Sequence, residues 1–474
     1  MTAVASQTRN RTKASRPLAT AGAAIAGTGV GYAVQRLFPT TTATGRGLRL
    51  AGLTAGITGS YIGYMLQSLF LGEAERDKKR RSTHLRTGRR MRDELLLLRG
   101  PAMKFGQALS LHTDIVPAEL LAELTKLQME APGMHASLAR AQFKSSFGRD
   151  PEQVFARFEP DPFAAASLGQ VHRAELPGGT RVVVKLQYPG IRAAIENDFR
   201  WVRQAALPLR ASGHLPAAAL DEMQRQIEAE TDYLREAAQL AFFSDALKPL
   251  EYVDIPRAYR EYSTDRVLTM TEVRGRHLDV FLAARPSQQV RDLVGARLVE
   301  LFYFQVLILK RLHADPHWGN YLFRDDGSIG VIDFGCVKEL GTDTVRRLSR
   351  SFLYAGPLDS PEFRQIMQGQ FAQPGKTLPA KTRRAVMAFA EQFYRKVYPP
   401  DPKAASEPFD FSDPAFLRDY IRVSGNLVRA KGIASEFIFL SRAEIGLYTT
   451  LHRLRARVRM ADIVRRLLHA SDTR

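Results

Sequence analysis

Cysteine is nearly absent from this sequence: Cys336 is the single cysteine among 474 residues. One cysteine excludes an intramolecular disulfide and any zinc site built from several cysteines, and it is compatible with a reducing compartment. Hydrophobic residues make up 45% and charged residues 25% of the chain, which is the balance of ordinary globular proteins. The length is sufficient for two or three domains with a sizeable buried core.

Acidic residues are absent from the start of the chain, where the first one is Glu73. Residues 1–99 hold 17 Lys and Arg against 5 Asp and Glu, so +12 of the net charge of +19 lies there. The densest basic run, 76–92, contains no Phe, Tyr or Trp that would stack on bases, which argues against nucleic acid as a partner. Because this run follows an uncharged apolar stretch, we expect it to meet anionic membrane lipids.

That apolar stretch covers 50–72, 23 residues without a charge. As a helix it would be about 34 Å long, enough to span the hydrocarbon core of a bilayer. Gly52, Gly56, Gly59 and Gly63 fall on one helical face and form a seam of the GxxxG kind, which suits packing against another helix or a homodimer. We therefore expect a membrane helix at about 50–72. A glycine-rich helical hairpin outside the membrane is the alternative.

The pattern richest in chemistry runs from HADPHWGNYLF at 313–323 to VIDFG at 331–335. Asp315 and Asn320 share a loop, and a predicted two-stranded ribbon separates them from Asp333. Phosphoryl transfer needs oxygen ligands for Mg²⁺ and a group near the attacking nucleophile. The order D-x4-N, strand pair, DFG is that of protein kinases. We expect Asn320 and Asp333 to ligate Mg²⁺ and Asp315 to orient the acceptor or accept its proton.

A lysine is placed among valines in VVVKLQY, where 182–188 is predicted to be a buried strand. A buried lysine is costly unless its ammonium reaches a partner, and in kinases the partners of such a lysine are the α- and β-phosphates and a helix carboxylate. Glu230 and Glu236 in ETDYLREAA lie six residues apart on one helix, so both cannot point at Lys185. We expect Glu236 to be its partner, and Glu230 with Asp232 to form a separate acidic pair.

A loop without the usual glycines precedes this lysine: FAAASLGQ at 163–170 stands where a kinase has its glycine-rich loop. Alanines restrict φ more than glycines do, so the loop should be stiffer and hold the nucleotide differently. We expect the phosphates to be covered by Ala164, Ala165, Ala166, Ser167 and Gly169. The adenine should bind the backbone at Glu272 and Val273, after the strand VLTM.

An activation segment is missing. After Gly335 the chain runs CVKELGTDTVRRLSR, a short turn and then a helix, with no Ala-Pro-Glu. Kinases that act on proteins use that segment to hold the peptide. A small or lipidic acceptor, or water, is therefore favoured over a protein acceptor.

Together these motifs resemble the UbiB (AarF-domain) family of atypical kinases over about residues 90–460. Four family motifs carry the resemblance: KFGQ at 104–107 (KxGQ), AAASLGQ at 164–170 (the alanine-rich loop), ETD at 230–232 (ExD) and HADPHWGN at 313–320 (HxDxHxGN). In the last of these Trp318 replaces the usual proline.

The resemblance implies an α+β, kinase-like bilobal fold with a small β-containing N-lobe and a mostly helical C-lobe. A helical N-terminal extension carrying Lys104 and Gln107 would close the nucleotide site against Glu230 or Asp232. The implied ligands are ATP or ADP with Mg²⁺, and the implied activity is ATP hydrolysis or phosphorylation of a small molecule or lipid. The implied biology is isoprenoid-quinone (ubiquinone) biosynthesis or lipid homeostasis, with quinone precursors or biosynthetic enzymes as partners. A nucleotide-binding regulator without phosphotransfer would carry the same residues and stays open.

We accordingly divide the chain into four parts. Residues 1–72 form a basic N-terminus with the membrane helix, 73–150 a basic juxtamembrane segment with the KxGQ extension, 151–275 the N-lobe and 276–474 the C-lobe. The acid-free start suits either a bacterial membrane protein with its kinase-like domain in the cytoplasm or an organellar transit peptide.

Overall fold

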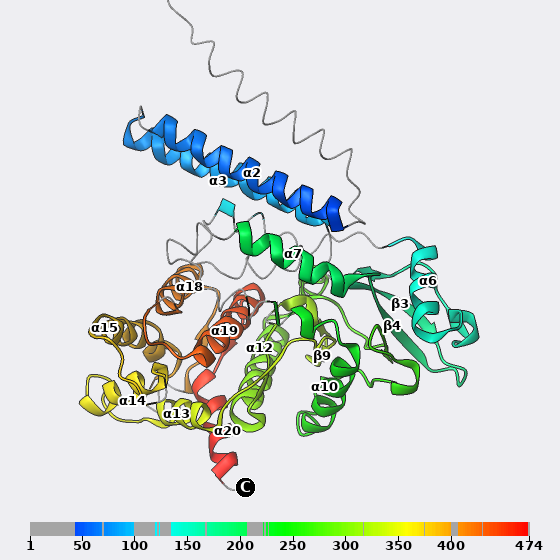
Figure 1. Cartoon of the computed structure of the whole chain (residues 1–474). Coiled ribbons are helices and arrows are strands. Elements are labelled where there is room, and N and C mark those ends of the chain that lie inside the picture. The colour runs from blue at the N-terminus through cyan, green and yellow to red at the C-terminus, as the bar shows by residue number, and fades with distance from the viewer. Residues whose placement is uncertain are drawn as a thin grey trace, which may run out of the picture.

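The computed structural model of this chain describes residues 43–68, 71–98, 119–120, 123, 134–165, 168–205, 221, 224–225, 227–315, 317–373, 375–399, 406–428 and 430–472. These residues form a two-lobed α+β body with a helical hairpin lying above it (Figure 1). The expected fold class is confirmed. The division of the chain at 150/151 and 275/276 stays a prediction.

The smaller lobe is built on an antiparallel five-stranded sheet. Its strands are β1 (Arg157–Phe158), β2 (Ala164–Ala165), β3 (Gly169–Glu175), β4 (Arg181–Gln187) and β6 (Val267–Thr271), in the order β1-β3-β4-β6 with β2 paired to β3. Helix α6 (Ala136–Phe147) packs on one face of the sheet, and α10 (Tyr233–Ala246) on the other. The valine-rich β4 is central and buried on both faces, as its β-branched residues favour.

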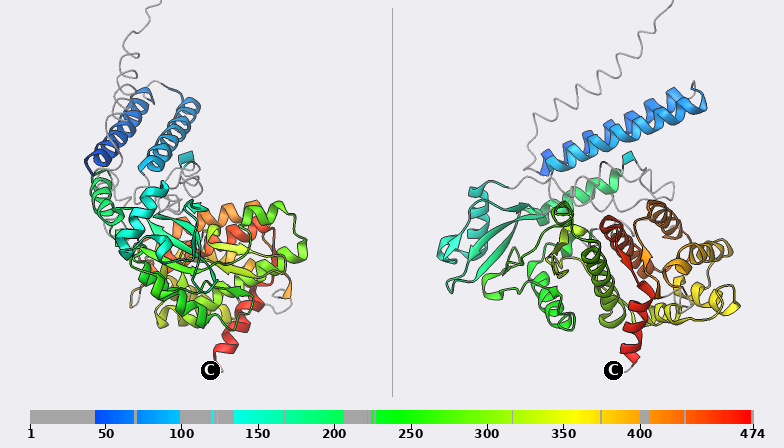
Figure 2. Two further views of the ribbon diagram at one scale, coloured as in Figure 1. Left: turned by 90° about the vertical axis from the view of Figure 1, so that its right-hand side faces the viewer. Right: turned by 180° about the vertical axis from the view of Figure 1, so that it is seen from behind.

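The larger lobe is mostly helical and lies beside the sheet (Figure 2). Its helices are α11 (Leu278–Ala283), α12 (Gln288–Tyr303), α13 (Thr342–Leu353), α14 (Pro361–Phe371), α15 (Ala380–Phe389), α16 (Arg395–Val397), α18 (Pro414–Val428), α19 (Ser435–Leu454) and α20 (Met460–Asp472), with π-helical turns at Phe304–Leu309 and Ala390–Tyr394. Its short strands are β5 (Val253–Asp254), β7 (Arg311–His313), β8 (Tyr321–Phe323), β9 (Ile329–Val331), β10 (Val337–Glu339), β11 (Phe409–Asp410) and β12 (Arg457–Val458).

The hairpin above the body consists of α2 (Ala43–Ser68) and α3 (Glu73–Leu98), and α2 also packs on α7 (Ile191–Ala205). Arg46 of α2 binds both carboxylate oxygens of Asp198 in α7. Arg49 pairs with Glu94 of α3 at 3.2 Å, and both side chains are nearly buried. Charge pairing at one end of α2 therefore joins the hairpin to itself and to the body.

This arrangement corrects the expected membrane span at 50–72. The helix there starts earlier than expected and includes two arginines, and five glycines and two threonines dilute the apolar stretch. Among the helices of the described part, none combines the length and the hydropathy needed to cross a bilayer. Part of the glycine seam makes room for α3: a Cβ at Gly56 would lie 2.2 Å from the Arg90 guanidinium, whereas Gly59 and Gly63 face open space.

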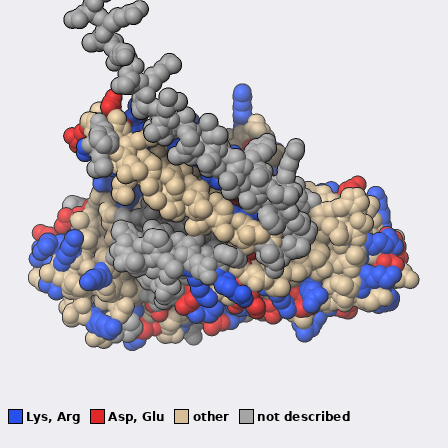
Figure 3. Space-filling model, turned by 45° about the horizontal axis from the view of Figure 1, so that its top comes forward, with Lys and Arg blue, Asp and Glu red and all other residues tan. Residues whose placement is uncertain are grey.

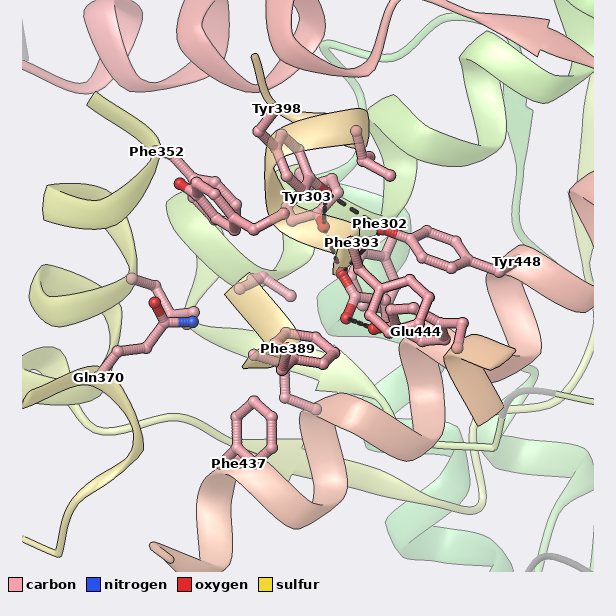
Figure 4. A pocket seen from close by; sticks show the side chains of 16 residues that line it. Phe302, Tyr303, Phe352, Gln370, Phe389, Phe393, Tyr398, Phe437, Glu444 and Tyr448 are labelled. Atoms are coloured by element: carbon pink, nitrogen blue, oxygen red, sulfur yellow. Dashed lines mark hydrogen bonds between the residues drawn. The ribbon is translucent and has the colours of Figure 1, made fainter. Parts of the chain in front are cut away.

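A buried carboxylate lies in the core of the larger lobe. Glu444 of α19 accepts hydrogen bonds from the hydroxyls of Tyr303 at 2.8 Å, Tyr448 at 3.3 Å, and Tyr420 (Figure 4). The surrounding aromatic side chains leave a cavity of about 40 Å³, which has room for water but not for a nucleotide. The nucleotide site must therefore be sought elsewhere.

The buried carboxylate leads to a pH prediction. Burial raises the pKa of Glu444 above its ordinary value of 4.5, with the tyrosine hydroxyls acting in the opposite direction. Its contribution to stability is then full below pH 4.5 and is lost as the pH rises through the higher pKa of the folded state. The free energy of unfolding of Glu444→Gln, measured relative to wild type by urea denaturation, should therefore increase as the pH rises above 4.5. A pH-independent difference would contradict this, and exposed Glu362→Gln supplies the baseline.

Candidate active site

The alternation of side chains along β4 decides where Lys185 points. Val182, Val184 and Leu186 face the cluster under α6, while Val183 faces α10 and the core of the larger lobe. Because successive side chains of a strand point to opposite faces, Lys185 lies on the same face as Val183. The lysine is therefore aimed between the two lobes.

Three predicted residues meet there in direct contact. The Lys185 ammonium lies 2.9 Å from both carboxylate oxygens of Glu236 and 2.9 Å from Oδ2 of Asp333. Burial raises the pKa of Glu236 to about 7, with Lys185 acting against it. Burial alone would lower the pKa of Lys185, but Asp333 and Glu236 outweigh burial and hold that pKa well above its usual range. The ammonium is therefore charged and shared between two carboxylates.

Helix α10 supplies the carboxylate and also supports the DFG segment. Asp232 is its N-cap and accepts hydrogen bonds from the backbone of the first turn, including Leu234 N at 3.1 Å. Glu236 lies one turn further on, facing the sheet. Further along the helix, Phe243 stacks on the buried Phe334 with ring centroids 4.6 Å apart. One helix thus positions Glu236 and the residue next to Asp333.

The second group of predicted residues lies on the loop after β7. The Asn320 amide nitrogen donates to Oδ2 of Asp315 at 3.0 Å, which leaves the amide oxygen of Asn320 available as an acceptor. The β8–β9 ribbon brings this loop to the DFG segment, because Ile332 N donates to the Asn320 carbonyl at 3.0 Å. Asn320 therefore lies across the ribbon from the residue before Asp333.

The oxygen atoms of this corner suit Mg²⁺. An amide oxygen and a carboxylate are hard ligands, and Mg²⁺ is usually held by one or two carboxylates together with phosphates and water. In the part of the chain that the structure describes, no group of three or more His, Cys, Asp or Glu side chains could hold a metal alone. The donor set thus fits a magnesium ion that arrives with a nucleotide.

The alanine-rich loop is the tip of a hairpin between β2 and β3. Ala164 pairs with Val171 and Ala165 with Gln170. Ala166 and Ser167 lie outside the described residues. Gly169 opens β3 where the chain passes very close to β4: a Cβ there would lie 2.3 Å from the Leu186 carbonyl oxygen. Gly169 is therefore required because β3 packs closely against the backbone of β4. This requirement holds independently of any contact between Gly169 and phosphates.

The remaining predicted residues fall in three places. Glu272 binds Arg173 of β3 at 2.9 Å, and Val273 packs on Gly330 of β9, so this segment joins the sheet to the larger lobe. Glu230 lies beside Gly335 of the DFG segment, since its Cγ would be 3.5 Å from a Cβ there. Lys104 and Gln107 lie outside the described residues. The roles assigned to all these residues stay predictions.

Sequence reasoning missed two residues that support the site. Tyr233 is almost fully buried, and its ring centroid lies 5.1 Å from the Lys185 ammonium. It precedes Glu236 by three residues, so helical spacing could have indicated it. Gln305, in the π-helical turn after α12, accepts from His313 N at 2.8 Å and holds the start of the loop that carries Asp315 and Asn320. No local pattern marks that contact.

A model of a known protein family covers the residues of this site. The ABC1 atypical kinase-like domain matches residues 126–367, about half of the chain. The chain belongs to the ABC1 atypical kinase-like family. The resemblance carried by the four motifs is thereby confirmed.

Two curated relatives show the range of the ABC1 family. The chain is 31% identical over 273 residues to the atypical kinase COQ8, mitochondrial, of Saccharomyces cerevisiae, covering 56% of this chain and 54% of that protein. It is 32% identical over 323 residues to ACTIVITY OF BC1 COMPLEX KINASE 7, chloroplastic, of Arabidopsis thaliana, covering 66% of this chain and 46% of the relative. The chain thus spans about half the length of the curated relatives it matches.

A solved structure is similar as well. It is the complex of Rv3197 with erythromycin from Mycobacterium tuberculosis, with a TM-score of 0.57 and 25% sequence identity, covering 78% of this chain and 92% of that one. The similarity extends over both lobes, so the ABC1 kinase-like architecture is shared well beyond the site.

The close approach at Gly169 gives a test of the site's geometry. Gly169→Ala should destabilise the protein by about 1–3 kcal/mol, because the added methyl meets backbone that cannot move aside cheaply. Gly178→Ala, in the β3–β4 turn where a Cβ meets nothing within 4 Å, is the matched control. Urea denaturation of both variants measures the difference. Equal stabilities would show that β3 and β4 are not so close at this point.

Proposed function

We propose that this ABC1-family chain binds Mg²⁺–ATP between its lobes and uses it as an ATPase or as a kinase of a small molecule or lipid. The observation that carries the proposal is the contact of Lys185 with Glu236 and Asp333, next to the Asp315–Asn320 pair. In kinases these roles belong to the phosphate-binding lysine, its helix carboxylate, the two metal ligands and the catalytic aspartate.

Each residue has a definite task in this proposal. Lys185 binds the α- and β-phosphates while Glu236 holds its ammonium in place. Asn320 and Asp333 would hold Mg²⁺, which would supply positive charge against the negative charge that develops during transfer. Asp315 lies against Asn320 and accepts the proton of the attacking hydroxyl or water. Asp333, which contacts Lys185 in this structure, would turn to the metal in the complex with the nucleotide.

The acceptor is proposed to be small. From Asp333 the chain reaches β10 and then α13 at Thr342 within a few residues, which leaves little chain for a peptide platform. An isoprenoid-quinone precursor or a lipid is the class that the family resemblance supports. The relatives named mitochondrial and chloroplastic support an organellar setting, as an alternative to the bacterial cytoplasm.

The metal site is tested by Asp333→Asn. Loss of the carboxylate should weaken Mg²⁺-dependent binding of ADP at least about tenfold and abolish ATP turnover, because the amide cannot neutralise the metal. Calorimetry with ADP at several Mg²⁺ concentrations, together with phosphate release, measures both. Asp325→Asn, an exposed residue in the β8–β9 turn, is the control. Wild-type affinity and rate in Asp333→Asn would refute the site.

We further propose that the hairpin contacts an anionic membrane surface with its far end. Exposed Ile62, Met65 and Leu66 end α2, and exposed cations of α3 begin a few residues later with Arg76, Lys78 and Lys79. Seen from the top of the molecule, the hairpin presents an elongated uncharged surface with charged side chains at one end (Figure 3). Apolar side chains next to cations suit the headgroup region of an anionic bilayer.

Reversing two of these charges tests the contact. Lys78→Glu with Lys79→Glu in the full chain should reduce sedimentation with phosphatidylglycerol vesicles about tenfold or more, since each cation near the surface contributes about 1 kcal/mol. Pure phosphatidylcholine vesicles and high salt should reduce binding of the wild type in the same way. The charge-matched control is Lys376→Glu with Lys381→Glu, two exposed lysines between α14 and the first turn of α15. Equal loss in both double variants would contradict a specific surface.

A further inference from the structure

The catalytic loop carries a tryptophan whose neighbours come from distant parts of the chain. Trp318 opens the 3-10 turn Trp318–Asn320, two residues before Asn320. Its indole lies against the ring of His317 at 4.9 Å and packs on the core of the larger lobe. The indole nitrogen is buried and makes no hydrogen bond within the described residues. Packing and charge, rather than hydrogen bonding, must therefore hold the ring in this position.

The charge comes from Arg453. Its guanidinium lies 4.8 Å from the centroid of the Trp318 ring, and tryptophan offers the strongest π face for a cation. Arg453 also pairs with Asp279 of α11, so the cation is held from both sides. It stands in the last turn of α19, where a positive charge is favourable to the helix dipole.

The helix behind Arg453 is well anchored. Glu444, on the same helix, is held in the core by hydroxyls from α12 and α18. Helix α11 in turn packs on β8, the strand that directly follows the catalytic loop. The contact of Trp318 with Arg453 therefore ties the loop to two elements that do not themselves carry catalytic groups.

We propose that Trp318 and Arg453 form a clamp that positions the Asp315–Asn320 loop for the magnesium nucleotide. Both are positioning residues, and the proposal rests on the function proposed above. The clamp acts on the loop that carries Asn320 and not on β4, which carries Lys185. Loosening it should therefore impair magnesium-dependent steps while leaving the binding of metal-free nucleotide unchanged. Small displacements of a catalytic loop are sufficient for large losses in rate.

The central test is Arg453→Met, which keeps an unbranched side chain on the ring and removes the charge. The Mg²⁺ concentration at half-maximal ADP binding, measured by calorimetry, should rise about five- to tenfold, with ADP affinity in EDTA unchanged. Arg453→Lys should restore most of the wild-type value because it keeps a cation over the ring. Arg346→Met, which breaks an exposed Arg–Asp pair on α13, is the matched control and should behave as wild type.

The fluorescence emission of Trp318 reports on its contact with Arg453 and can be measured without ATP turnover. The chain has two tryptophans, so Trp201→Phe leaves Trp318 as the single emitter. In that background Mg²⁺–ADP should change the emission of Trp318 with the half-saturation found by calorimetry, and Arg453→Met should shift the emission before any ligand is added. Where Arg453→Met does not fold, Asp279→Asn loosens the guanidinium from its other side and should give a smaller shift of the same sign.

The outcomes separate the two proposals. If the wild type binds Mg²⁺–ADP and Arg453→Met has the same Mg²⁺ half-saturation or the same Trp318 emission, the clamp is refuted and the proposed function stands. If the wild type does not bind Mg²⁺–ADP, the proposed function is wrong, and the proposal of a clamp is refuted as well. If Arg453→Met also lost affinity for ADP in EDTA, the substitution would have damaged the nucleotide site in general. That result would also refute a positioning role.

Discussion

A buried ammonium that must be neutralised organises this molecule. Lys185 stands in the middle of a valine-rich strand, where an unpaired charge would cost several kcal/mol. It reaches Glu236 on α10 and Asp333 after β9, which are far apart in the sequence. The sheet, the helix beside it and the start of the larger lobe are therefore tied at one point. Leaving one of these carboxylates without a partner would cost more free energy than a surface ion pair contributes to stability.

The same contact bears on the proposed binding of a magnesium nucleotide. Lys185 pairs with Asp333, a carboxylate that we propose as a metal ligand. In the proposed complex, phosphates would give the ammonium new partners and Mg²⁺ would give Asp333 one, so all charges would stay paired. Asn320 is held ready by Asp315, and the β8–β9 ribbon places it against the DFG segment. The residues that we propose to hold the nucleotide are thus already in mutual contact.

The hairpin shows how a pattern typical of membranes can have another cause. Glycines that suggested a bilayer seam leave room in part for Arg90 of α3. Two arginines at the start of α2 are paired with Asp198 and Glu94 instead of facing lipid headgroups. The apolar side chains that remain exposed gather near the far end of the helix, which is why we place the proposed membrane contact there.

Local sequence determined much of the site. The motif spacing identified Asp315, Asn320 and Asp333, and the kinase pattern indicated a helix carboxylate as the partner of Lys185, because these relations rest on a motif of known geometry. The expectation that Glu230 and Glu236 share one helix was wrong, since Asp232 begins α10 as its N-cap. Tertiary structure alone decided that α2 pairs its arginines with α3 and α7, and that Arg453 covers Trp318. Those partners are brought together only when distant elements pack. The residues that neighbour a side chain in the sequence do not indicate which distant charge will lie next to it in the fold.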